Sequence, residues 1–332
     1  AISGGGDLAV DLAAISDVLT LSGTNTATGD VRVDGGMLTL AGGDALADTV
    51  RVTLADAAAA GLTLAKAETI AGLAGGGSGG GDVGLGGSTL TLAGDGDAVF
   101  TYGGVISGTG GLTVTGGSHY LDGASTFTGA TTVGGGLLGG SGAVGGDLTV
   151  ATGATLAPGS ASAAGTLEVA GDLDLAAGST LQVLLDGSDL SNVSQVDVAG
   201  NVTIASGAGV SVSVSQTAGT YVASDSTYVI LTADGTIATP DVAVTTDSAT
   251  LDFYDLEDFD VADFTPGDGE IALIATRAAN AYSNPAVVTA GNNRRIGAAL
   301  DSLTAVADAN PTGDAADLLA QLQALDADQL NA

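Results

Sequence analysis

The sequence predicts an all-β protein, a right-handed parallel β-helix (solenoid), with a short α-helical C-terminal segment. Three observations predict this fold: abundant glycine, a core of small aliphatic residues, and internal repeats. Glycine makes up 55 of the 332 residues, and 45% of the chain is hydrophobic although only 3% is aromatic. The mean hydropathy of +0.42 argues against a disordered glycine-rich chain, because disorder requires low hydrophobicity.

Two sets of internal repeats define the repeating unit. The stretch GDVRVDGGMLTLAGG at 29–43 recurs 52 positions later as GDVGLGGSTLTLAGD at 81–95. In the second set, GDLTVATGATL at 146–156 is followed by GDLDLAAGSTL at 171–181 and GNVTIASGAGV at 200–210, at offsets of 25 and 29. Short alternating strands bounded by glycine, in a unit of this length, are typical of one coil of a β-solenoid.

Stacked in parallel, about 4.8 Å apart, such coils place their inward aliphatic side chains in continuous columns. Residues 1–277 would form on the order of 11 coils, a rod about 50 Å long. Glycine is expected at corners, where a positive φ or a close backbone approach leaves no room for a Cβ atom. A β-sandwich is the alternative all-β interpretation. The predicted inward residues are Val31, Val33, Leu38, Leu40, Val83, Leu85, Leu90, Leu92, Leu112, Val114, Leu148, Val150, Leu167, Val169, Leu173, Leu175, Val202 and Ile204.

The charge balance excludes two classes of partner. Six basic residues stand against 38 acidic ones, for a formal net charge of -32. Nucleic acids and anionic membrane surfaces both require clustered lysine and arginine, so neither is an expected partner. Without cysteine, stability has to come from burial and strand pairing. The sequence shows neither a long apolar run nor a signal peptide, and we expect the chain to be part of something larger.

The periodicity changes after the β pattern of GEIALIATR at 269–277. Beyond it, aliphatic residues recur at helical spacing in two groups, and Asp314 suits the cap of the second. Two short amphipathic helices are therefore expected. Their apolar positions are Ile296, Leu300, Leu303 and Val306 in the first group and Leu318, Leu322 and Leu325 in the second.

Residues 100–138, FTYGGVISGTGGLTVTGGSHYLDGASTFTGATTVGGGLL, resemble the passenger-associated repeat of bacterial autotransporters, the type V secretion proteins. Thr115 stands where that pattern has Lys, and Phe127 where it has Tyr. Residues 141–183 resemble the stretch that follows in such passengers, including the A-x-L-x-P-G turn at 154–159. The matching positions are Phe100, Gly104, Ile106, Gly108, Gly110, Leu112, Gly116 or Gly117, Leu121, Phe127, Gly129, Thr131, Val133 and Leu137.

The resemblance implies three regions: β-helix passenger repeats at 1–160, a C-terminal β-helix cap with an autochaperone-like role at 161–277, and a helical linker at 278–332. The linker would lead to an outer-membrane β-barrel, the expected partner, which is absent from this chain. The terminal coils, roughly 160–277, would act as a folding nucleus. The implied function is a surface-displayed stalk that supports secretion and folding across the outer membrane and presents upstream sequence. It would lie outside a Gram-negative cell, anchored at the outer membrane or released after secretion.

Two alternatives to the stalk stay open. The first is an adhesin or self-associating rod that contacts a host surface, a neighbouring cell or another copy of itself. Such a rod would need an exposed apolar or Asn/Thr-rich ladder along one side. The second is a scaffold that carries an upstream enzyme.

Three features of the sequence resemble sites of chemistry. Ser78 completes a G-x-S-x-G match within 76–80, but no strand–turn–helix context surrounds it. His119, the single histidine, lacks the partners of a zinc site or a triad and is expected at the surface or a coil end. The acidic run at 255–264 suggests calcium binding or a carboxylate pair, although a solvated loop is the preferred interpretation; its acidic residues are Asp255, Glu257, Asp258, Asp260 and Asp263. The sequence therefore predicts no enzymatic activity, catalytic residue, metal site or cofactor.

Overall fold

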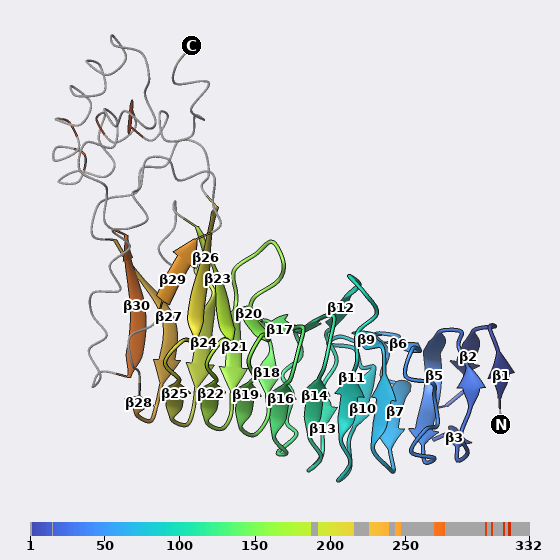
Figure 1. Cartoon of the computed structure of the whole chain (residues 1–332). Coiled ribbons are helices and arrows are strands. Elements are labelled where there is room, and N and C mark those ends of the chain that lie inside the picture. Colours follow the sequence, from blue (N-terminus) through green and yellow to red (C-terminus); the bar gives the residue numbers. More distant parts are fainter. Residues whose placement is uncertain are drawn as a thin grey trace.

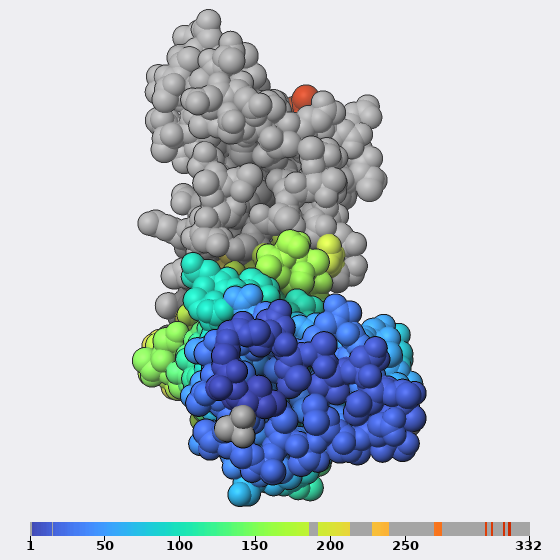
Figure 2. Space-filling view, turned by 90° about the vertical axis from the view of Figure 1, so that its right-hand side faces the viewer, coloured from blue at the N-terminus to red at the C-terminus, as the bar shows by residue number. Residues whose placement is uncertain are grey.

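The computed structural model describes residues 2–14, 16–186, 192–215, 226–238, 243–246 and 269–275, together with Leu303, Ala307, Ala315, Leu318 and Leu319. The described part is all-β and is built from long parallel sheets. Figure 1 shows the strands lying side by side in chain order from β1 (Ser3–Gly4) onward. Figure 2 views the same stack from its N-terminal end, where the blue residues face the reader.

The largest sheet has fifteen strands in two arms, which are joined through the long strand β5 (Val31–Leu40). Besides β5, the first arm contains β2 (Leu8–Asp11), β6 (Arg51–Leu54), β9 (Gly72–Gly75), β12 (Val99–Tyr102), β15 (Ser118–Leu121), β17 (Leu137–Gly140), β20 (Thr155–Pro158), β23 (Thr180–Asp186), β26 (Gly209–Ser215) and β29 (Ala243–Thr246). The second arm contains β3 (Val18–Leu21), β7 (Ala60–Leu64), β10 (Asp82–Gly84) and β13 (Ile106–Ser107).

Two further sheets and one short pair complete the described strands. The eight-stranded sheet contains β8 (Glu68–Ile70), β11 (Leu90–Leu92), β14 (Leu112–Val114), β16 (Thr131–Val133), β19 (Leu148–Val150), β22 (Leu173–Leu175), β25 (Val202–Ile204) and β28 (Ile237–Ala238). The five-stranded sheet contains β18 (Ala143–Val144), β21 (Thr166–Val169), β24 (Gln195–Val198), β27 (Ser226–Ala233) and β30 (Glu270–Ala275). Strand β1 pairs with β4 (Thr26–Ala27).

The chain visits these sheets in a fixed rotation. From β6 it passes to β7 in the second arm and then to β8 in the eight-stranded sheet, before β9 returns to pair beside β6. From β18 onward the five-stranded sheet takes the second position of this rotation, as in the series β23, β24, β25 and β26. Nearly every circuit from β6 to β28 therefore adds one parallel strand at each of three positions; between β15 and β17 the chain forms only β16 and has no strand in the second position.

The register confirms the second set of sequence repeats. Leu148 in β19 pairs with Leu173 in β22, and Leu173 pairs with Val202 in β25, which are the offsets of 25 and 29 found in the sequence. These three copies stack directly on one another. Backbone stacking thus explains why the same residues recur at those spacings.

The 52-residue repeat does not correspond to stacked coils. Val31 pairs with Val52 in the first arm, whereas its sequence counterpart Val83 pairs with Leu62 in the second arm. The first copy lies along β5, which belongs to both arms, whereas the second copy is divided between β10 of the second arm and β11 of the eight-stranded sheet. The sequence similarity arises because each sheet position needs the same short, alternating, glycine-bounded strand.

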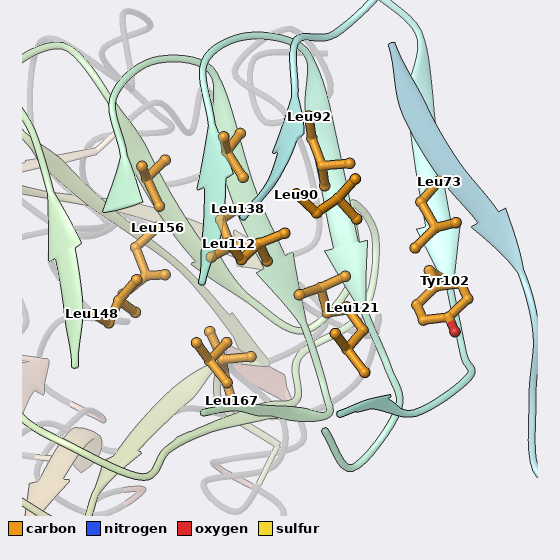
Figure 3. Close-up of a cluster of buried hydrophobic side chains, with 14 of the residues drawn as sticks. Leu73, Leu90, Leu92, Tyr102, Leu112, Leu121, Leu138, Leu148, Leu156 and Leu167 are labelled. Atoms are coloured by element: carbon orange, nitrogen blue, oxygen red, sulfur yellow. The ribbon is translucent and has the colours of Figure 1, made fainter. Parts of the chain in front are cut away.

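All of the predicted inward residues lie in the core, none more than 3% exposed. Figure 3 shows leucines of successive coils, such as Leu90 and Leu112, or Leu138 and Leu156, gathered in the space between the sheets. Burying a side chain of this size contributes about 1.5–3 kcal/mol. The column of aliphatic side chains is therefore the main source of stability in the described stack.

Among the described strand pairs, every one is parallel except β27 with β30. Parallel pairing of this extent contradicts the β-sandwich alternative, whose sheets are antiparallel. The antiparallel strand β30 is the last strand of the five-stranded sheet and so ends its parallel growth. The two predicted C-terminal helices fall almost wholly outside the described residues and stay a prediction. In the described part of the chain, no helix is both long and apolar enough to cross a membrane.

Candidate functional site

The eight-stranded sheet carries a continuous row of threonines. On five neighbouring strands the central residue is threonine, flanked on each side by buried side chains, and strand pairing holds the five in register. These side chains are half-buried on the first three strands and exposed on the next two. We call this set the threonine row; its members are Thr69, Thr91, Thr113, Thr132 and Thr149.

The threonine row presents one hydroxyl and one methyl group per coil, at the strand spacing of about 4.8 Å. Beyond Thr149 the row continues in register through Asp174 to Thr203. Threonine pairs across strands also stabilise a sheet, by about 0.2–1 kcal/mol each, so the row has a structural role in any case. In addition, the threonine row forms a regular, uncharged stripe of hydrogen-bonding groups on an acidic protein.

A second polar ladder lies at the corner that precedes the same sheet. The backbone N–H of Asp172 donates to Oδ1 of Asp147 over 3.0 Å, and the N–H of Asn201 donates to Oδ1 of Asp172 over 2.7 Å. Thr236 continues the series, since its N–H donates to Oδ1 of Asn201 over 3.1 Å. Each of these side-chain oxygens satisfies a backbone donor of the next coil.

Basic side chains offset little of the acidic surface. In the described part of the chain, Arg32 pairs with Asp34 over 2.6 Å and Arg51 pairs with Asp95, and all four side chains are about a third exposed or more. Exposed pairs of this kind contribute little to stability. No group of three or more acidic or histidine side chains among the described residues is placed to hold a metal ion. The predicted acidic run at 255–264 lies outside the described residues.

The prediction for His119 was wrong, because the ring is buried rather than at the surface. The side chain is only 1% exposed and stacks on Phe100, with ring centroids 5.0 Å apart. Strand β15 alternates so that His119 and Leu121 take the register positions beside Phe100 and Tyr102 of β12. Burial lowers the pKa of His119 to about 4, against a smaller opposing effect of its hydrogen bond to Gly116.

Ser78 lies at the exposed tip of a turn between β9 and β10. The backbones of Gly77 and Gly80 pair antiparallel on either side of it, and the N–H of Gly79 donates to Oδ1 of Asp56 over 2.6 Å. A strand–turn–strand connection is not the strand–turn–helix elbow that positions a nucleophilic serine. The glycine pattern around Ser78 therefore serves a tight turn.

Sequence reasoning missed a buried carboxylate, Glu68. It is 2% exposed and takes an inward position beside Leu90, yet both carboxylate oxygens are bonded. Oε2 accepts the N–H of Ala45 over 3.0 Å and Oε1 accepts that of Leu46 over 2.7 Å. Burial raises the pKa of the Glu68 carboxyl, although these two N–H groups act in the opposite direction. The available signal was a charged residue at a strand position that holds leucine in the next two strands, Leu90 and Leu112.

The threonine row was also missed, although triplets such as Leu112-Thr113-Val114 and Leu148-Thr149-Val150 carry its signal. Alternation alone places the central threonine of each triplet outward once its neighbours are assigned to the core. A scan against protein-family models and a search of curated proteins both found no match to this chain.

Proposed function

We propose that this chain is the surface-displayed stalk of an autotransporter passenger, folded as a right-handed parallel β-helix that supports secretion across the outer membrane and presents upstream sequence. The observation that carries the proposal is the rotation of the chain through three strand positions, with one parallel strand added at each position in nearly every circuit from β6 to β28. Parallel strands joined by a crossover connect with right-handed geometry in nearly all proteins, which supports the handedness. The sequence resemblance over 100–183 supplies the family.

The region at 161–277 is proposed as the cap and folding nucleus. Two features favour it. Its strands β23 and β26 each have seven residues and pair along their full length, and the antiparallel strand β30 closes one sheet edge. In solenoids, stability is approximately a sum of nearest-neighbour interfaces, so growth from a formed end needs no second nucleation. A nucleus near the membrane pore would let each later coil fold as it emerges and so oppose backsliding.

A display experiment tests the nucleus. In a full-length protein with its barrel, Leu175→Asp and Ile204→Asp each bury a charge in the terminal coils, whereas Val33→Asp is the matched change in an N-terminal coil. All three side chains are 3% exposed or less in the wild-type protein. We expect the terminal substitutions to reduce surface display more than Val33→Asp. Equal losses from both regions would count against a C-terminal nucleus.

The full reading frame provides a separate test of the stalk. We expect the complete protein to carry an outer-membrane β-barrel after residue 332, with this chain recovered at the cell surface or released from it. A complete protein without such a barrel would contradict the assignment to an autotransporter. The proposed partner is that barrel, with no nucleic acid involved.

The adhesin or self-associating rod is kept as a second candidate because the threonine row is a ladder of the kind such a rod needs, half-buried on three strands and exposed on two. Cells displaying the chain should then aggregate or attach more than cells lacking it. Thr113→Lys and Thr132→Lys would disrupt the row on adjacent strands, while Asp174→Lys changes charge beyond the five threonines. Loss of aggregation only with the two threonine variants would favour this function, and no difference among the strains would favour the stalk.

A further inference from the structure

The buried histidine has one hydrogen-bonded and one unpartnered ring nitrogen. Nε2 of His119 lies 3.0 Å from the carbonyl oxygen of Gly116, a contact that requires Nε2 to carry the proton. Nδ1 is then an unprotonated acceptor, and it is buried without a hydrogen-bond partner. The geometry therefore fits a neutral imidazole.

Protonation would convert Nδ1 of His119 into a buried N–H donor, and no acceptor lies within hydrogen-bond distance of Nδ1. The ring is held on one side by the stacked ring of Phe100, and along the sheet by Leu138, its register partner on β17. An unpaired charge in such a site is costly enough that the local structure opens before the group ionises.

We propose that His119 is an acid-sensitive point of the stack, and that its protonation separates β15 from its neighbours β12 and β17 while the coils nearer the C-terminus stay closed. The device goes beyond the proposed stalk function, since it concerns where the rod opens rather than what it displays. It would apply equally to a stalk or an adhesin.

The charged and titratable groups near the site do not supply a counter-charge. The loop before β12 carries Asp97 and Asp95, and Asp95 is paired with Arg51. Asp122, just after β15, accepts the N–H of Ser141 over 3.0 Å. No contact between these groups and the imidazole is observed in the described part of the chain. Strand β17 consists of leucine and glycine only.

The two tyrosines near the ring titrate in the alkaline range. Tyr102 on β12 donates its hydroxyl to the carbonyl oxygen of Gly81, and Tyr120 is the neighbour of His119 on β15. Burial raises the pKa of both phenols. Neither group therefore changes charge in the acid range where His119 would respond.

The direction of the pH effect follows from proton binding. The opened histidine has an ordinary pKa of 6.5, whereas burial holds the pKa of the folded one near 4. Between these values the open form binds the extra proton, so the equilibrium constant for local opening should rise by up to about tenfold per pH unit as pH falls. Below about pH 4 the effect should level off.

Hydrogen exchange of the full chain between pH 7 and pH 4, corrected for intrinsic exchange rates, tests the proposal. We expect the amides of β15 and β17 to lose protection by up to about tenfold per pH unit through the window, while those of β22 and β25 hold theirs. Parallel loss in all four strands, or no loss in β15, would overturn the proposal. This comparison needs no variant and so does not depend on a mutant folding.

Two variants sharpen the test. His119→Leu places in β15 the residue type found at the paired position of β17, and it should abolish the additional acid loss at β15. Tyr120→Phe changes the neighbouring side chain without altering any group that titrates between pH 4 and 7, so it should keep the wild-type loss. An acid response that persists in His119→Leu would refute the role of the histidine.

Discussion

Replacing Gly145 by alanine should destabilise the fold more than the same substitution at Gly134 or Gly153. Gly145 directly follows β18, and a Cβ atom built on it would lie 1.5 Å from the carbonyl oxygen of Phe127 in the preceding coil. An ordinary contact needs at least 3.4 Å, so the two backbones would have to separate by about 1.9 Å. The obstacle is a backbone oxygen, which cannot rotate away as a side chain would.

Two other glycines separate this steric effect from backbone strain. Gly134 is exposed, and a Cβ there would meet nothing nearer than the Val114 carbonyl oxygen at 3.7 Å. Gly153 has a φ of +79° but no atom within 4 Å of its Cβ position. Its substitution therefore tests conformational strain alone.

The expected magnitudes differ in sign and size. Gly134→Ala should stabilise the fold by about 0.4–1 kcal/mol, because alanine restricts the unfolded chain. Gly153→Ala should cost about 1–2 kcal/mol for left-handed backbone. Overpacking a core with movable side chains costs about 1–3 kcal/mol, so Gly145→Ala, which must displace backbone, should cost at least about 3 kcal/mol.

Urea unfolding followed by circular dichroism gives the three differences. Hydrogen exchange of β14 and β16 detects local opening, because long stacks of repeated strands need not unfold in a single step. The ranking Gly145→Ala, Gly153→Ala, Gly134→Ala from most to least destabilised is the expected result. If Gly145→Ala were as stable as Gly134→Ala, the close coil contact and the reason given for corner glycine would both be wrong.

Three further outcomes are expected. Tyr102→Phe should lower the free energy of unfolding in urea by about 1–3 kcal/mol, because the buried Gly81 carbonyl oxygen, 2.6 Å from the phenol oxygen, loses its hydrogen-bond donor. Tyr120→Phe is the control, and equal losses in the two variants would contradict a stabilising role for the Tyr102 hydrogen bond. Since burial raises the pKa of Glu68, its contribution to stability is fully present below its unfolded pKa of about 4.5 and is lost as pH rises through the folded pKa. The stability of wild type relative to Glu68→Gln should therefore decline as pH is raised from 4 to 7, and a constant difference would refute this. Finally, with a net charge of -32, raising monovalent salt from about 10 mM to 150 mM should raise Tm, whereas a fall would show that repulsion is not the dominant charge effect.

Alternation within each strand made the core predictable. In Leu173-Asp174-Leu175 the two leucines are buried and the aspartate is exposed, as a period of two requires. The same rule could have placed Thr113 and Thr149 outward. Local pattern therefore determines which face of a strand is buried.

The pairing of strands was less predictable than the core, because the number of residues per coil varies. Along the eight-stranded sheet, Thr131 pairs with Leu148 and Val202 pairs with Ile237, and the sequence separation of the second pair is more than twice that of the first. A fixed repeat period cannot assign such pairs. The continuity of the threonine row and the register of the 52-residue repeat both depend on these variable lengths, and so emerged only from the structure.

His119 illustrates a different limit. In the run Ser118-His119-Tyr120-Leu121 the last three residues are all buried, so burial does not alternate, and a lone histidine carries no sign of whether its ring faces in or out. Only the pairing of β15 with β12, the strand before it in the same sheet arm, puts the imidazole against Phe100. Its burial was thus a consequence of tertiary register rather than of local preference.

The excess of aspartate has a structural basis in addition to its effect on solubility. At corner after corner, a carboxylate oxygen accepts a backbone N–H from the next coil, as Asp82 does for Val105 over 3.0 Å and Asp172 does for Asn201 over 2.7 Å. Lysine and arginine cannot fill this position because they offer no acceptor. Asparagine can, as Asn201 does for Thr236 over 3.1 Å. The corner therefore requires a side-chain acceptor, and this acceptor does not need to carry a negative charge.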